Sequence, residues 1–192
     1  MLTRPTFTVD WEPYFCYKPY SQFWEETDPL VEEPTLYLLD LLKRHEIKAI
    51  WFCVGWLVDK RPDLVAEIRG NSHIIGTHTY YHSLGQAGLK QKYQVDINHP
   101  LFRSPKFKGQ KRLYSGGFWF RLFPYWISKK LLDQSGVFYI HPYDVMLESP
   151  VKSFKRTVGL KTARNKLERL CREVEFEDPV LQSTSSRPVF VL

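Results

Sequence analysis

The first part of the chain alternates between strand-like and helix-like segments. Residues 6–12 are rich in β-branched and aromatic side chains and alternate as a strand does, and residues 48–55 and 73–76 are apolar runs typical of buried strands. Amphipathic helical patterns separate them at residues 34–44 and 62–69. This β-α-β-α-β order favours parallel strands joined by crossover helices, so we expect an α/β fold.

The second half of the chain carries weaker patterns. Strands are expected at residues 101–107 and 136–144, and residues 115–124 indicate a glycine turn followed by an aromatic strand. A basic helix is expected at residues 161–173. The sequence contains no internal repeat or linker, and its length suits one compact core, so we expect a single domain over residues 1–192.

Composition narrows the range of partners. The formal charge is +6, but acidic residues are interleaved with the basic ones, which favours an ordinary solvated surface over a nucleic-acid-binding stripe. The three cysteines are far apart and form no metal-binding pair, which suggests a reducing compartment. The sequence has neither a signal-peptide core nor a run of about 18 apolar residues. We therefore expect a soluble, cytoplasmic protein without a membrane span, and the sequence leaves its oligomeric state open.

Two carboxylates close the first expected strand. Asp10 and Glu12 are separated by one residue, so they point to the same face of a strand. Two like charges this close raise each other's proton affinity unless a cation lies between them. A solvent-facing acidic strand end is the common alternative, but aromatic residues surround these acids, and an exposed edge is rarely built that way.

Two histidines follow the third expected strand. His78 and His82 are four residues apart, so a helical turn would place both imidazoles on one face, where they can supply two nitrogen ligands to a divalent metal such as zinc. Six histidines in this chain give roughly 0.2 such pairs by chance, so the spacing alone does not decide. Parallel α/β folds carry their chemistry at the carboxyl ends of strands, where both the acids and the histidines fall. That coincidence predicts a shared metal site.

The loop over residues 11–26 is dense in aromatic side chains. Such rings either fill the core or form a stacking wall for a ring-shaped ligand such as a sugar. Core packing is the expected role for most of them.

Four short stretches resemble, in order, the motifs of the polysaccharide deacetylase family, whose shared core is the NodB homology domain of carbohydrate esterase family 4. They are residues 8–12, 78–82, 102–105 and 138–142. The last of these, together with residues 116–124, is similar to the branch associated with exopolysaccharide and O-antigen loci. The resemblance implies an irregular (β/α) barrel related to the TIM barrel. The stretches between the second and third motifs, and after the third, are shorter than the family pattern, which implies a shortened and incomplete barrel.

The resemblance also implies a metal site and a general base. Glu12, His78 and His82 would hold a divalent metal, with Zn²⁺ favoured, and leave positions open for water and the substrate. Asp10 would take a proton from that water, and Arg103 would pair with Asp10 and keep it ionised.

The remaining implied roles concern the substrate. His141 would protonate the departing amine, and the backbone N–H near Lys106 would help to hold the oxyanion. No acidic partner that orients His141 is evident from the sequence. Trp11 and Tyr14 flank the two acids, so we expect their rings to line a groove for a glycan.

The function implied by the resemblance is a metal-dependent N-deacetylase acting on an N-acetylated sugar in cell-surface polysaccharide synthesis. Two alternatives stay open. One is a catalytically inactive relative that binds glycan through its aromatic loop. The other is a metal-independent amidase of the same fold, because Glu12 replaces the commoner aspartate. A nucleic-acid-binding module is disfavoured because the chain carries no such motif.

Overall fold

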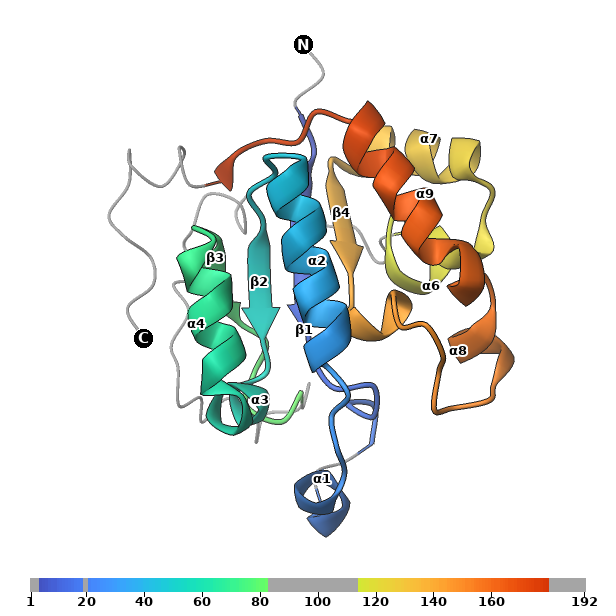
Figure 1. Cartoon of the computed structure of the whole chain (residues 1–192). Helices are drawn as coiled ribbons and strands as arrows, with labels where there is room; N and C mark the ends of the chain where they lie inside the picture. Colours follow the sequence, from blue (N-terminus) through green and yellow to red (C-terminus); the bar gives the residue numbers. More distant parts are fainter. Residues whose placement is uncertain (1–3, 19–20, 83–113, 180–192) are drawn as a thin grey trace.

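A computed structural model of the chain describes residues 4–18, 21–82 and 114–179 (Figure 1). Its four strands in these ranges form one parallel sheet in the order β3-β2-β1-β4. The strands are β1 (Thr6–Trp11), β2 (Ile50–Cys53), β3 (Ile74–Thr77) and β4 (Val137–Ile140). The predicted α/β fold with parallel strands is confirmed. The shortened barrel stays a prediction, because the strand expected at residues 101–107 lies outside the described residues.

Helices connect and cover these strands. They are α1 (Gln22–Glu26), α2 (Glu32–Arg44), α3 (Gly55–Lys60), α4 (Pro62–Gly70), α6 (Gly117–Leu122), α7 (Tyr125–Ser135), the 3-10 helix η2 (Pro142–Asp144), α8 (Phe154–Thr157) and α9 (Leu160–Glu173). In Figure 1, α4, α2 and α9 run across one face of the sheet, while α1 lies beyond the carboxyl ends of the strands. No helix in the described part of the chain is long and apolar enough to cross a membrane.

The long helix α2 shows how the sequence dictates a covering element. Glu32 and Glu33 lie in its first turn and Lys43 and Arg44 in its last, so the charges at both ends complement the helix dipole. Four of its leucines, Leu38, Leu39, Leu41 and Leu42, are buried, and each contributes about 1.5–3 kcal/mol of hydrophobic stabilisation.

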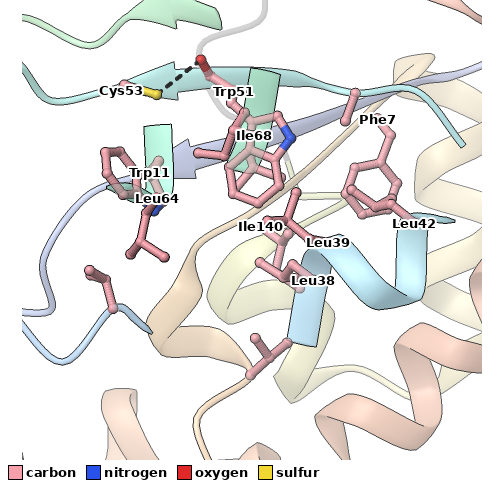
Figure 2. Packing of buried hydrophobic residues seen from close by; sticks show 14 of the residues in the cluster. Phe7, Trp11, Leu38, Leu39, Leu42, Trp51, Cys53, Leu64, Ile68 and Ile140 are labelled. Atoms are coloured by element: carbon pink, nitrogen blue, oxygen red, sulfur yellow. Dashed lines mark hydrogen bonds between the residues drawn. The ribbon is translucent and has the colours of Figure 1, made fainter. Parts of the chain in front are cut away.

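Strand alternation sorts the side chains of β1 onto two faces. Phe7 and Trp11 belong to the buried cluster between the sheet and α2, which Figure 2 shows together with Leu38, Trp51 and Ile140. Val9 shares their face, whereas Thr8 and Asp10, which alternate with them, point to the opposite face. The core therefore lies between the sheet and its helices, while the carboxyl edge of β1 remains available for polar groups.

The segment expected to be an aromatic strand is a helix. In α6 the amide of Phe120 donates to the carbonyl of Gly116, and the amide of Phe123 donates to that of Trp119. A side chain at Gly116 would lie 1.8 Å from the carbonyl oxygen of Tyr139, so only glycine lets this helix begin against β4. The prediction of a strand at residues 115–124 was therefore wrong.

Candidate active site

Strand register places the carboxyl ends of β1 and β3 level with each other. Trp11 pairs with Cys53 and Cys53 with Thr77, so the residues that follow them leave the sheet at one height. The amide of His78 donates to the carbonyl of Cys53 at 2.9 Å, which extends that alignment by one residue. Glu12 and His78 therefore meet at the carboxyl edge, although 66 positions separate them in the sequence.

The turn that carries both histidines is irregular, so the predicted helical turn was wrong. Thr79 and His82 adopt positive φ angles of 62° and 55°, which residues other than glycine rarely adopt. Amides at the start of α3 hold the turn instead, with Gly55 donating to the carbonyl of Thr79 and the next residue to that of Tyr80. A side chain at Gly55 would lie 2.6 Å from the Tyr80 ring, so this approach requires glycine. The two imidazoles still come together, with ring centroids 4.8 Å apart.

Glu12 and the two histidines form a cluster suited to a cation. Oε2 of Glu12 lies 3.3 Å from Nε2 of His78 and 3.0 Å from Nε2 of His82. One ligand atom from each of the three residues falls within 4.8 Å of the others. The carboxylate is 2% exposed, and both imidazoles are about a quarter exposed, so the cluster is reached from one side.

The state of Oε2 tests whether a metal fits. This oxygen is buried, and neither imidazole contact meets hydrogen-bond geometry, so it has no hydrogen-bond partner among the residues that the structure describes. An ionised buried oxygen without such a partner is costly unless a cation neutralises it. Two imidazole nitrogens and one carboxylate oxygen are the donor set of many catalytic zinc sites. These residues therefore fit a divalent metal.

The other oxygen of Glu12 is fully engaged. Oε1 accepts hydrogen bonds from the Tyr143 hydroxyl at 2.8 Å and from the Cys16 thiol at 2.9 Å. Burial and the nearby Glu12 carboxylate raise the pKa of both donors, so both stay protonated at neutral pH. Burial alone would raise the pKa of Glu12, but the interactions with His78 and the other histidines outweigh it and lower that pKa.

Asp10 and His141 face the cluster from β1 and from the end of β4. Val9 pairs with Ile140, so the residues that follow them lie side by side. Nε2 of His141 lies 3.7 Å from Oδ2 of Asp10 and 3.6 Å from Oε1 of Glu12. Burial raises the pKa of Asp10, an effect that His141 and the two cluster histidines oppose only in part.

Asp144 is the acidic partner of His141 that was not evident from the sequence. Its Oδ2 lies 2.6 Å from Nδ1 of His141 and accepts a hydrogen bond from the His141 amide at 3.1 Å. Burial lowers the pKa of His141, but the Asp144 carboxylate outweighs it and raises that pKa to about 9. The signal in the sequence was local: a proline followed by an acid three residues after His141 has the spacing of a helix N-terminal capping box.

A buried arginine completes this arrangement. The guanidinium of Arg121 donates to Oδ1 of Asp144 at 2.8 Å, and both side chains are 1% exposed. It also donates to the backbone carbonyls of Lys155, Arg156 and Val158. His141, Asp144 and Arg121 therefore form a continuous buried chain of charged hydrogen bonds.

The two aromatic residues assigned to the substrate differ in placement. Trp11 is completely buried, and its indole donates to the Thr35 hydroxyl at 2.9 Å on the side of the sheet that faces α2. No ring face is left for a ligand, so the expected stacking of Trp11 against a sugar was wrong. Tyr14 is half-buried and packs edge-on against Phe15 at 5.1 Å. Arg103 and Lys106 lie outside the described residues, and their roles stay predictions.

Family models match two parts of the chain. The model described as "Polysaccharide deacetylase" matches residues 25–100. The model described as "Domain of unknown function (DUF3473)" matches residues 92–180. The second match covers β4, His141 and the chain of charges behind it.

Curated relatives are short matches within longer proteins. Two peptidoglycan-N-acetylglucosamine deacetylases of Bacillus cereus are 44% identical over 50 residues and 33% identical over 95 residues. These alignments cover 26% and 49% of this chain, and 18% and 43% of the relatives. This chain thus spans less than half the length of either relative. A solved peptidoglycan N-acetylglucosamine deacetylase aligns with a TM-score of 0.48 at 15% identity, over 93% of this chain and 88% of that one.

The match over residues 25–100 contains the second of the four motifs, residues 78–82. That match includes both cluster histidines and the helices that precede them. The resemblance drawn from the motifs is therefore supported: residues 25–100 of this chain match the polysaccharide deacetylase family model.

Proposed function

We propose that this protein is a metal-dependent N-deacetylase that removes acetyl groups from an N-acetylated sugar of a cell-surface polysaccharide. The observation that carries the proposal is the cluster of Glu12, His78 and His82, faced by Asp10 and His141. Within the described part of the chain, Oε2 of Glu12 is buried in this cluster without a hydrogen-bond partner. The names of the curated relatives, which are peptidoglycan deacetylases, support the substrate class.

The metal would be held by Glu12, His78 and His82, and the mixed nitrogen and oxygen donors favour Zn²⁺. The chemistry that such a cation supplies when bound is Lewis acidity toward a carbonyl oxygen and toward water. The protein's own part is to hold the carboxylate ionised and both imidazoles turned toward it.

Asp10 is the proposed general base. It lies on the same face of the chain as Glu12 but is not among the three residues that converge on one point, so its carboxylate is free to accept a proton from attacking water. Its raised pKa makes it a better proton acceptor than an ordinary aspartate. Arg103 is proposed to steady it.

His141 is the proposed general acid. With its pKa raised to about 9, the ring carries a proton at neutral pH, and Nε2 points toward the acids while Asp144 holds Nδ1. The water oxygen forms a bond to the acetyl carbon. The bond between that carbon and the sugar nitrogen then breaks, and the nitrogen takes the proton from His141. Water is consumed, and acetate and a free amino sugar are released.

Further parts of the proposal rest on the sequence. Lys106 is proposed to contribute a backbone N–H to the oxyanion, and Tyr14 to contact the sugar. Residues 1–192 are proposed to act as one domain, because the site takes its side chains from β1, β3 and β4. The exopolysaccharide or O-antigen context is supported by residues 116–124 and the last motif.

The test joins metal analysis to acetate release. The purified protein should bind one equivalent of Zn²⁺ and release acetate from N-acetylated oligosaccharides or peptidoglycan. Glu12→Ala should lose metal and activity together, whereas Asp10→Asn should keep the metal and lose only activity, since the amide keeps the shape but accepts no proton. A wild-type protein that binds no divalent metal with excess zinc would refute the proposal and favour the binding-only or metal-free alternatives.

A further inference from the structure

Two side chains that the proposed chemistry does not use converge on Glu12. The thiol of Cys16 and the hydroxyl of Tyr143 both donate to Oε1, at 2.9 Å and 2.8 Å. Neither belongs to the cluster that can hold the metal. The two donors come from segments 127 positions apart in the sequence, so their meeting on one oxygen is a product of the fold.

Each donor is held in place by its own surroundings. A turn after β1, closed by the Cys16 amide donating to the carbonyl of Pro13, brings the buried thiol back beneath the carboxylate. The ring of Tyr143 stacks on His141 with centroids 4.5 Å apart and planes 12° apart. The guanidinium carbon of Arg156 lies 4.1 Å from the Tyr143 ring centroid, which restricts the ring further.

The consequence is an asymmetric carboxylate. An ionised carboxylate oxygen has two lone-pair directions in its plane, and two donors occupy them at Oε1. Oε2 receives no hydrogen bond from residues 4–18, 21–82 or 114–179, and it faces His78 and His82. Rotation of the carboxylate would break both hydrogen bonds, so Glu12 can offer only one oxygen to the cluster. Groups that orient a metal ligand in this way are needed for metal affinity in many proteins.

We propose that Cys16 and Tyr143 are positioning residues that fix Glu12 as a single-oxygen metal ligand. Cys16 acts as a hydrogen-bond donor and serves neither as a ligand nor as a nucleophile. Tyr143 links this carboxylate to His141 through the ring stack, so the ligand and the general acid share one support. The inference rests on the proposed function, because it assigns roles toward the same metal site.

The test measures zinc affinity in the purified full chain, by competition with a chromophoric chelator, with circular dichroism to verify folding. Tyr143→Phe and Cys16→Ala should each weaken zinc binding about 10–100-fold, the usual effect of removing a group that orients a ligand. Cys16→Ser should restore most of the affinity, because a hydroxyl can donate to the same oxygen. A residue that merely filled space would not be rescued in this way.

Matched controls separate this effect from a general loss of packing. Cys171→Ala removes another buried thiol, and Tyr37→Phe removes another partly buried hydroxyl, and both lie outside the site. Neither should change zinc affinity more than twofold. If Tyr143→Phe and Cys16→Ala bind zinc as tightly as the wild type, the positioning roles are refuted, while zinc binding and acetate release by the wild type would leave the proposed function standing. A wild type that binds no zinc would overturn both.

Discussion

Asp144→Asn removes the negative charge beside His141 while keeping the shape of the side chain. Asp144 is 1% exposed and accepts hydrogen bonds from the ring and amide of His141 and from Arg121. The asparagine amide cannot neutralise the two cations that flank it. Breaking a buried ion pair by removing one partner costs about 3–5 kcal/mol, so the free energy of unfolding should fall by about that amount.

The expected change in the pKa of His141 follows from the same contacts. Asp144 is the leading cause that raises this pKa from 6.5 to about 9. A rise of this size corresponds to roughly 3 kcal/mol of preference for the protonated ring. Burial opposes this rise, and the carboxylates of Glu12 and Asp10 add to the effect of Asp144. In Asp144→Asn the pKa of His141 should therefore fall by about 1–3 units.

This shift also sets a pH window for stability. Because the pKa of folded His141 lies above its unfolded value, the protonated ring stabilises the fold fully below about pH 6.5, and this contribution is lost as the pH rises through about 9. In Asp144→Asn most of that alkaline loss of stability should disappear. If the variant is an active deacetylase, the alkaline limb of its turnover profile should move to lower pH.

The measurement is an NMR titration of the histidine side-chain nitrogens in metal-free protein, with the His141 signal assigned by its absence in His141→Gln. Urea unfolding at pH 7 and pH 10 gives the stability. Asp133→Asn, which removes an exposed carboxylate from α7, is the matched control and should leave the pKa of His141 unchanged. A folded Asp144→Asn whose His141 still titrates near pH 9 would refute the reasoning.

Three further substitutions test other parts of the structure. Trp11→Ala should lower the free energy of unfolding by about 3–5 kcal/mol in urea titrations and leave zinc affinity unchanged, because the indole lies in the core; a loss of zinc binding without destabilisation would contradict this placement. Gly55→Ala should weaken zinc binding, since its new methyl group must displace Tyr80 from the turn between the two histidines; wild-type affinity by chelator competition would show that the turn adapts. His141→Ala should keep stoichiometric zinc by metal analysis and lose about 10²- to 10⁴-fold in turnover, and loss of the metal would make His141 a ligand.

Much of the site was predictable because strand geometry is regular. The period of two along β1 puts Asp10 and Glu12 on one face, and parallel pairing puts Glu12 level with the end of β3. The same period places Trp11 on the face opposite the two acids, where its indole donates to Thr35 of α2. Proximity in sequence to the acids was a poor guide, because adjacent strand residues face opposite sides of the sheet.

Other features depend on tertiary contacts that no local pattern carries. The turn from His78 to His82 takes its shape from amides at the start of α3. The two imidazoles lie close together, as the four-residue spacing predicted, but the backbone between them is not helical. Residues 115–124 suit a strand by composition, yet Gly116 packs against the Tyr139 carbonyl and the chain turns into α6. The contact of Cys16 with Tyr143 through Glu12 required the fold itself.

The distance along the chain between the proposed metal ligands has a thermodynamic consequence. Glu12 and His82 are 70 positions apart, and the intervening segment contains β2, β3 and the helices that cover them. A cation shared by these two residues would act as a cross-link that closes this long loop. Cross-links over loops of this length restrict the unfolded chain by about 4 kcal/mol in the chain-entropy treatment. Metal occupancy would therefore report on the packing of β2 and β3 against β1, and the bound ion would stabilise the fold as well as take part in the chemistry.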